Sequence, residues 1–240
     1  MGFCEKIIID QEEQSMSKME NGWIIDGLDE LEMENTAVED LDSENINLIF
    51  LGIDQSGSME TYRREMKTAL AGFKDALADS READEILVAR ANFDSGIEVG
   101  GYKRIDEFDT GFCASGCTAM YDAITEGTER LKVYREFLKK EGMRVKAVFA
   151  VFSDGADNDS KSSFGEAKRA VEYLNDEEIT TAFISFGGGA AKVAKDLGFR
   201  NMLDVSSSAS ELRRAFQCLS KSVIESSKSV LADEDDFFKV

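Results

Sequence analysis

Three oxygen-bearing side chains alternate where an apolar run ends. Asp54, Ser56 and Ser58 follow residues 48–53, which we predict to be a buried strand because apolar residues occupy both of its faces. Gly57 permits a tight turn, so that the three side chains converge on one side. Oxygen ligands without nitrogen or sulfur suit a hard cation such as Mg²⁺. The stretch therefore predicts a metal site outside the carboxyl end of a strand, where open parallel sheets bind their ligands.

This stretch resembles the Asp-x-Ser-x-Ser signature of von Willebrand factor A domains, which forms part of their metal-ion-dependent adhesion site. The family completes its site with a threonine and an aspartate from two later loops. Residues 116–119, Gly-Cys-Thr-Ala, resemble the Gly-Gly-Thr-x loop, and residues 148–155 resemble the strand-Thr-Asp-Gly loop. Cys117 replaces a common second glycine and Ser153 a threonine, and neither departure removes a ligand oxygen. The resemblance covers roughly residues 46–231.

The resemblance implies a site for one Mg²⁺ or Mn²⁺ ion, formed by Asp54, Ser56, Ser58, Thr118 and Asp154. The two serine hydroxyls would ligate the ion directly, and Thr118 directly or through water. Asp54 and Asp154 would act largely through water or from outside the coordination sphere. Neutral hydroxyl ligands leave the cation electrophilic, so that a carboxylate from a partner protein can replace a bound water. The implied function is metal-mediated recognition of a protein that presents an acidic residue.

An enzymatic function is the first alternative. An acid directly after a strand is also the nucleophile of phosphatases of the haloacid dehalogenase class. That class needs Asp-x-Asp, and Ser56 replaces the second acid, so that a general acid is missing. The chain has no His, which excludes a Ser-His-Asp triad and His metal ligands. We therefore expect no enzymatic activity. The alternatives to a binding module are a metal-dependent hydrolase or phosphatase, and a scaffold domain without a functional metal.

The net charge of −20 is unevenly distributed along the 240 residues. Residues 1–45 contain 14 acidic and 2 basic residues, and residues 232–240 contain 4 and 1, whereas residues 46–231 contain 30 and 25. We therefore expect an acidic N-terminal extension over 1–45, a von Willebrand factor A domain over 46–231 and an acidic tail over 232–240. Such a charge repels nucleic acid and anionic membranes, so neither is an expected partner.

The four Cys are too few and too scattered for a disulfide framework, which favours reduced thiols and a cytoplasmic location. The first twenty residues lack the apolar core of a signal peptide, and no apolar run is long enough to span a membrane. Together with residues 118–123, Thr-Ala-Met-Tyr-Asp-Ala, these features resemble small stand-alone bacterial members associated with tellurite resistance and stress. Those members generally work with ATPases, kinases or phosphatases, which implies an adaptor role.

Apolar strand patterns alternate with helical patterns along the domain, which predicts an α/β fold with a doubly wound, mostly parallel sheet and helices on both faces. The resemblance specifies six strands, one of them antiparallel at an edge, in a Rossmann-like arrangement. Residues 97–99 are the expected antiparallel strand, and Ser58 is expected to cap the helix that follows the first strand.

Several other polar segments are predicted to form turns only. Asp94, Asp157 and Asp159 are interpreted as turn residues, with Asp94 also a candidate to support the site from its rim. Residues 187–189, Gly-Gly-Gly, form a strand-to-helix turn and not a phosphate loop, because the Walker spacing is absent.

The two arms leave alternatives open. The extension is either a disordered acidic leader or a segment that docks through Trp23 and the apolar residues after it. In the tail, Phe237 and Phe238 could anchor an acidic segment that masks the metal site with a carboxylate.

Overall fold

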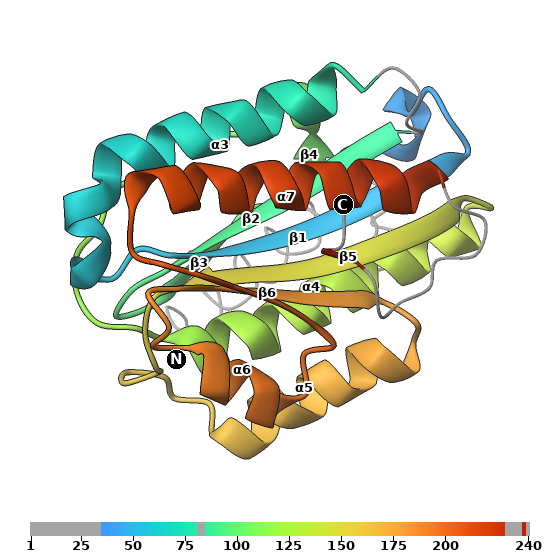
Figure 1. The fold of residues 1–240 in the computed structure, drawn as a ribbon. Coiled ribbons are helices and arrows are strands. Elements are labelled where there is room, and N and C mark those ends of the chain that lie inside the picture. Colours follow the sequence, from blue (N-terminus) through green and yellow to red (C-terminus); the bar gives the residue numbers. More distant parts are fainter. Residues whose placement is uncertain (1–34, 81–84, 229–236, 239–240) are drawn as a thin grey trace, which may run out of the picture. The chain divides into compact units, whose positions relative to one another are not determined.

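A computed structural model describes residues 35–80, 85–228 and 237–238, all of which belong to the unit Glu34–Val240 (Figure 1). Its strands are β1 (Asn45–Asp54), β2 (Glu85–Phe93), β3 (Ile97–Val99), β4 (Lys103–Arg104), β5 (Arg144–Ser153), β6 (Thr180–Phe186) and β7 (Asn201–Val205). Its α-helices are α3 (Arg63–Ala78), α4 (Met120–Lys140), α5 (Phe164–Asp176), α6 (Ala191–Leu197) and α7 (Ala209–Lys228). Short 3₁₀ turns are η1 (Val38–Asp40), η2 (Gly57–Tyr62) and η3 (Ile105–Glu107).

The strands form one sheet in the order β3-β2-β1-β5-β6-β7. All neighbours pair in parallel except β3, which pairs antiparallel with β2, so the predicted doubly wound sheet with an antiparallel edge strand is confirmed. The sheet has a seventh strand that the sequence pattern did not indicate. This strand, β4, also pairs antiparallel with β2, and its two residues are too few to produce a periodic pattern.

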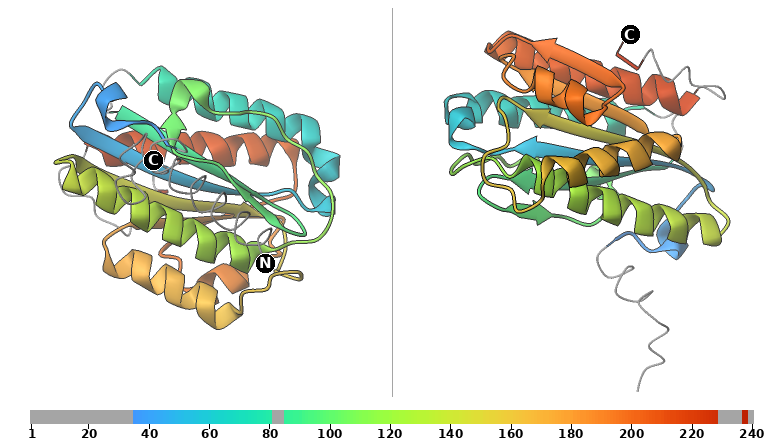
Figure 2. Two further views of the ribbon diagram at one scale, coloured as in Figure 1. Left: turned by 180° about the vertical axis from the view of Figure 1, so that it is seen from behind. Right: turned by 90° about the horizontal axis from the view of Figure 1, so that it is seen from below.

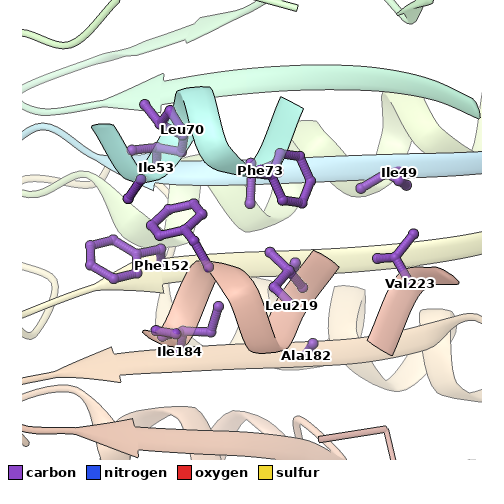
Figure 3. Packing of buried hydrophobic residues seen from close by; sticks show 14 of the residues in the cluster. Ile49, Ile53, Leu70, Phe73, Phe152, Ala182, Ile184, Leu219 and Val223 are labelled. Atoms are coloured by element: carbon purple, nitrogen blue, oxygen red, sulfur yellow. The ribbon is translucent and has the colours of Figure 1, made fainter. Parts of the chain in front are cut away.

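Helices cover both faces of the sheet, as predicted. In Figures 1 and 2, α3 and α7 lie on one face, and α4, α5 and α6 lie on the other. Alternate residues of the central strands point to opposite faces. Figure 3 shows Ile53, Phe152 and Ile184 from three neighbouring strands in one cluster with residues of α3 and α7, among them Leu70 and Leu219. Burial on both faces explains why β1 and β5 have almost continuous apolar sequences.

The opposite face of β1 packs against α4 through Phe50. Its ring stacks on Phe149 of β5, with centroids 4.5 Å apart and planes 8° from parallel. Gly127 of α4 lies over the same ring, and a Cβ atom at this position would be 2.2 Å from Phe50 Cζ. The absence of a side chain at Gly127 therefore lets α4 approach the sheet closely.

The described ends of the unit contact its body. Thr36 donates its backbone N–H to the carbonyl of Tyr102 over 2.8 Å, and Tyr134 donates its hydroxyl to the Thr36 carbonyl over 2.8 Å. Residues 35–36, which we assigned to the acidic extension, are therefore packed against the domain. The proposed docking through Trp23 lies outside the described residues.

Phe237 is 8% exposed and belongs to the apolar cluster between the sheet and α7. Its N–H is 3.3 Å from Oδ1 of Asn201, the first residue of β7. Phe237 thus lies near the amino end of β7, whereas Asp54 and Ser153 are the last residues of β1 and β5, at the carboxyl edge of the sheet. The predicted masking of the metal site by a tail carboxylate concerns Asp233 to Asp236, which lie outside the described residues.

Candidate metal centre

Four of the five predicted site residues meet where β1 and β5 end. The chain continues from β1 to β2 on one side, and from β5 to β6 and β7 on the other, so that the order of strands reverses between β1 and β5. Open α/β sheets leave a crevice outside the carboxyl ends of the strands at such a point. Asp54 is the last residue of β1, and Asp154 follows Ser153, the last residue of β5. The topology therefore brings residues 100 positions apart in the sequence to one place.

Asp54 is fully buried, and both of its carboxylate oxygens accept hydrogen bonds. The Ser56 N–H donates to Oδ1 over 2.8 Å, and the Ser153 hydroxyl donates to Oδ2 over 2.6 Å. Burial raises the pKa of Asp54, the hydrogen bonds from Ser153 and Ser56 oppose this shift, and the nearby Asp154 adds to it. Asp54 fixes the turn after β1 and places a negative charge beneath it.

A chain of oxygen atoms leads from this turn to the neighbouring strand. The hydroxyl oxygens of Ser56 and Ser58 are 3.0 Å apart, and the Ser58 hydroxyl donates to Oδ1 of Asp154 over 3.0 Å. The prediction that Ser58 caps the following helix is wrong. Its hydroxyl contacts Asp154, and the chain passes through η2, whose N-cap is Ser56 without a side-chain capping bond, before α3 begins.

Thr118 lies on a third loop, which is joined to the other two through backbone groups. The Ser115 N–H donates to the Gln55 carbonyl over 2.7 Å, and the Gly57 N–H donates to the Gly116 carbonyl over 3.1 Å. Thr118 is buried, but within the described residues its hydroxyl forms no hydrogen bond to the other four site residues. The structure thus brings its loop to the site, and among the described residues no hydrogen bond joins the Thr118 hydroxyl to the other four side chains.

Asn158 and Asp157 hold the loop after β5 against the loop of Thr118, and we did not identify either as a site residue. The Thr118 N–H donates to Asn158 Oδ1 over 2.8 Å, and the Tyr121 N–H donates to Asp157 Oδ1 over 3.1 Å. Asp157 also accepts a hydrogen bond from Ser160. Asp157 is therefore not the solvated turn residue that we expected. These bonds span about 40 positions, and no local pattern signals such contacts.

Arg90 supports the loop that leads to Thr118. Its Nε donates to Asn92 Oδ1 over 2.8 Å, and its Nη1 donates to the Asp109 carbonyl over 2.6 Å. Burial lowers the pKa of the guanidinium, and the neighbouring Asp109 partly restores it. A charged residue inside the apolar run of β2 was a visible signal in the sequence, because such a residue needs partners when it is buried.

Asp94 forms the expected turn by accepting the Gly96 N–H over 3.1 Å, and the Ser115 hydroxyl is 3.3 Å from its other oxygen.

Asp122 joins the first turn of α4 to the loop after β5. It accepts the N–H of Lys161 over 3.0 Å and that of Ser162 over 2.7 Å. Partial burial acts to raise the pKa of Asp122, but the hydrogen bonds from Lys161 and Ser162 outweigh it, so that the pKa lies below its ordinary value. The ionised carboxylate therefore stabilises the loop that carries Asp154.

We expect Asp122→Asn to destabilise the protein by about 1 kcal/mol at pH 7, because an amide oxygen can accept only one of these bonds. A carboxylate whose pKa is lowered by folding contributes stability above its unfolded pKa of about 3.9 and loses it as the pH falls through the folded value. The difference between wild type and variant should therefore shrink below about pH 4 in denaturant unfolding experiments. A difference that stays constant down to pH 2 would contradict this role of the charge.

The donor set fits a hard divalent cation. The five residues offer carboxylate and hydroxyl oxygens, and among the described residues no Lys or Arg forms an ion pair with Asp54 or Asp154. The described ranges contain no group of three or more His, Cys, Asp or Glu side chains placed to hold a metal, so a site here depends on the hydroxyls. Ser56, Ser58 and Thr118 carry the hydroxyls that would serve as neutral ligands.

Two thiols lie in the loop before Thr118. Cys113 and Cys117 are both exposed and free, and Cys218 on α7 is also free.

Among the described helices, none is both long enough and apolar enough to cross a membrane.

Comparison with known proteins gave matches to solved structures. No family model matches the chain, and no curated protein matches it. A structure of the pilus adhesin SpaC from Lactobacillus rhamnosus GG superposes with a TM-score of 0.62 at 13% identity, covering 76% of this chain and 30% of the adhesin. A von Willebrand factor type A structure from Catenulispora acidiphila has a TM-score of 0.54 at 19% identity, over 76% of this chain and 43% of the other.

The mussel byssus protein PTMP1, in a structure with a zinc-occupied metal-ion-dependent adhesion site, has a TM-score of 0.54 at 18% identity over 76% of this chain and 46% of PTMP1. This chain thus spans less than half the length of each of these three structures. At such identities the comparison informs on the fold alone. The chain has the fold of von Willebrand factor A domains.

Proposed function

We propose that this chain is a metal-dependent protein-binding module. One Mg²⁺ ion, or Mn²⁺, would be held by Ser56, Ser58 and Thr118, with Asp54 and Asp154 supplying negative charge. The observation that carries the proposal is the run of oxygen atoms from Asp54 through the two serines to Asp154 at the strand reversal. The metal-occupied site of the similarly folded PTMP1 supports a divalent ion at this edge of the sheet.

A bound divalent cation supplies an electrophilic centre that can accept a carboxylate oxygen from a partner protein. The chain's own residues orient and support that centre. Asp54 holds the Ser56 turn through the Ser56 N–H, and Asp154 holds the Ser58 hydroxyl. Ser58 is exposed, so that a partner can approach the site from this side.

The absence of catalysis is part of the proposal. Asp54, the acid in the position of a phosphatase nucleophile, is 0% exposed, and Ser56 and Ser153 donate to its two oxygens. A nucleophile needs access to its substrate, so this environment favours a binding role. The absence of His from the whole chain also removes the commonest general base.

We further propose a cytoplasmic adaptor in a bacterial stress response, such as one associated with tellurite resistance, that works with an ATPase, kinase or phosphatase. Support comes from the resemblance of residues 118–123 to that branch of the family and from the low number of Cys. The excess of acidic residues disfavours nucleic acid and anionic membranes as partners.

The metal is tested first. Calorimetry with Mg²⁺ should give about one site per chain, and Mg²⁺ at about 100 times its dissociation constant should stabilise the fold by about 2.7 kcal/mol. Ser56→Ala removes a ligand oxygen and should abolish both effects, whereas Ser226→Ala on α7, away from the site, should leave them unchanged. Equal Mg²⁺ binding by wild type and Ser56→Ala would refute the assignment.

The partner is tested next. Wild-type protein immobilised with Mg²⁺ should retain host proteins that elute with EDTA, and an Asp154→Ala column should not retain them. Mutation of acidic residues on the surface of a retained protein should then identify the carboxylate that binds. Retention that is indifferent to EDTA and to Asp154→Ala would leave a scaffold function as the better description.

A further inference from the structure

The loop between β6 and α6 packs directly against the loop that carries Asp154. A Cβ atom at Gly189 would be 2.4 Å from the carbonyl oxygen of Asp154 and 3.5 Å from the Cα atom of Gly155. Real Cβ atoms essentially never come so close to another heavy atom. Because the contacted oxygen belongs to the backbone, it cannot rotate away as the end of a flexible side chain could. The two loops can adopt this arrangement only when position 189 has no side chain.

The three glycines of this loop are needed for different reasons. Gly187 and Gly188 have φ angles of 81° and 77°, a conformation that side chains disfavour. Gly189 is not among the residues with positive φ. Its backbone would therefore accept alanine, and only the contact with Asp154 excludes a side chain there.

Both flanks of the glycine loop are fixed. The Gly187 N–H donates to the carbonyl of Val205 on β7 over 2.8 Å. Ala190 is fully buried, and its carbonyl accepts the Ala194 N–H over 3.0 Å at the start of α6. The backbone is thus bonded at Gly187 and at Ala190, on either side of position 189, and these bonds oppose a movement of the glycine loop away from Asp154.

A side chain at position 189 would displace the backbone of Asp154 and Gly155. Ser153 is buried at the end of β5, but Asp154 and Gly155 are only half-buried. The Asp154 side chain is the acceptor for Ser58 over 3.0 Å, and the Gly155 N–H is 3.3 Å from the Ser153 hydroxyl. Displacement of the Asp154 backbone would therefore separate its carboxylate from Ser58.

We propose that Gly189 is a positioning residue for the metal site. Because Gly189 has no side chain, the Asp154 backbone can lie where the Asp154 carboxylate reaches Ser58. The glycine loop itself contains none of the five predicted ligand residues. This inference rests on the proposed metal-binding function. The metal affinity then depends on the loop between β6 and α6, two elements that contain none of the predicted ligands.

The test compares Gly189→Ala with Gly188→Ala, the neighbouring glycine. A Cβ atom at Gly188 would meet nothing within 4 Å, but its φ is positive, so Gly188→Ala strains the loop without touching Asp154. Mg²⁺ affinity is measured by calorimetry, thermal unfolding is measured in EDTA, and amide chemical shifts of residues 153–158 are measured by NMR in the metal-free protein.

We expect Gly189→Ala to weaken Mg²⁺ binding at least tenfold and to shift the amide signals of residues 154–156 in the metal-free protein. Gly188→Ala should lower the melting temperature but change Mg²⁺ affinity less than about threefold. Wild-type affinity and unshifted amide signals in Gly189→Ala would overturn the proposal, because the glycine loop, and not the loop of Asp154, would then have moved.

A second variant covers the case in which Gly189→Ala does not fold. Insertion of one glycine between Gly188 and Gly189 loosens the same contact without adding a side chain, and it should weaken Mg²⁺ binding and increase hydrogen exchange at Gly155. Unchanged binding and exchange would count against the proposal. If wild type itself binds no Mg²⁺, the proposed function fails, and the amide signals alone decide whether Gly189 positions Asp154.

Discussion

Asp54→Asn is expected to abolish stabilisation by Mg²⁺ while leaving the metal-free protein at least as stable as wild type. Asp54 is 0% exposed, and no Lys or Arg in the described part of the chain forms an ion pair with it. Burying a carboxylate without a compensating cation is costly. The residue that supplies charge to the proposed site should therefore destabilise the fold until a metal binds.

Asparagine suits the geometry of this position. Its Oδ1 can still accept the Ser56 N–H, and its Nδ2 can donate to the Ser153 hydroxyl in place of the present acceptor. The Ser153 hydroxyl can then donate to the Gly155 carbonyl, which is 3.2 Å away. The Ser56 N–H and the Ser153 hydroxyl therefore both keep a hydrogen-bond partner, and the negative charge is lost.

Thermal unfolding of wild type and Asp54→Asn in EDTA and in excess Mg²⁺ measures both effects. The Mg²⁺-dependent gain, about 2.7 kcal/mol for wild type at about 100 times the dissociation constant, should vanish in the variant. Asp54→Ala is the control, because it leaves the Ser56 N–H without its acceptor and should cost about 1–3 kcal/mol even in EDTA. If Asp54→Asn is less stable than wild type in EDTA, the carboxylate itself supports the metal-free fold.

The strands that carry the site could be predicted because each has a strong local signal. Residues 48–53 and most of β5 are apolar on both faces, and these strands are central in the sheet. The signature Asp54-x-Ser56-x-Ser58 was visible because its residues are close in the sequence. The meeting of Asp54, Ser56, Ser58 and Asp154 follows from these strands, since parallel neighbours end at the same edge.

The supporting contacts could not be predicted, since they join residues far apart in the sequence and show no periodicity. Asn158 bonds the backbone of Thr118, and Asp122 bonds that of Lys161 and Ser162, across about 40 positions. A single Asp or Asn in a loop is equally compatible with a solvated turn. Ser58 was misassigned as a helix cap for a related reason, because its actual acceptor, Asp154, is 96 residues away.

Gly127→Ala is expected to destabilise the domain by about 3 kcal/mol, although alanine normally favours a helix over glycine by about 1 kcal/mol. The added Cβ would be 2.2 Å from Phe50 Cζ and 2.7 Å from two further ring atoms. Phe50 is fully buried, and its ring is stacked on Phe149, so the ring has no space into which to move. Overpacking therefore outweighs helix propensity, and α4, which begins two residues after Thr118, must shift from the sheet.

Denaturant unfolding in EDTA measures this effect separately from metal binding, and about 3 kcal/mol corresponds to a fall in melting temperature of about 6–12 °C for a domain of this size. Gly72→Ala on α3 is the matched control, because a Cβ there meets nothing within 4 Å and should stabilise by up to about 1 kcal/mol. Phe50→Leu removes the ring, so the double variant Phe50→Leu, Gly127→Ala should be more stable than the sum of the single effects predicts. Additive effects of the two substitutions, or a Gly127→Ala protein as stable as Gly72→Ala, would show that α4 does not depend on close approach to Phe50.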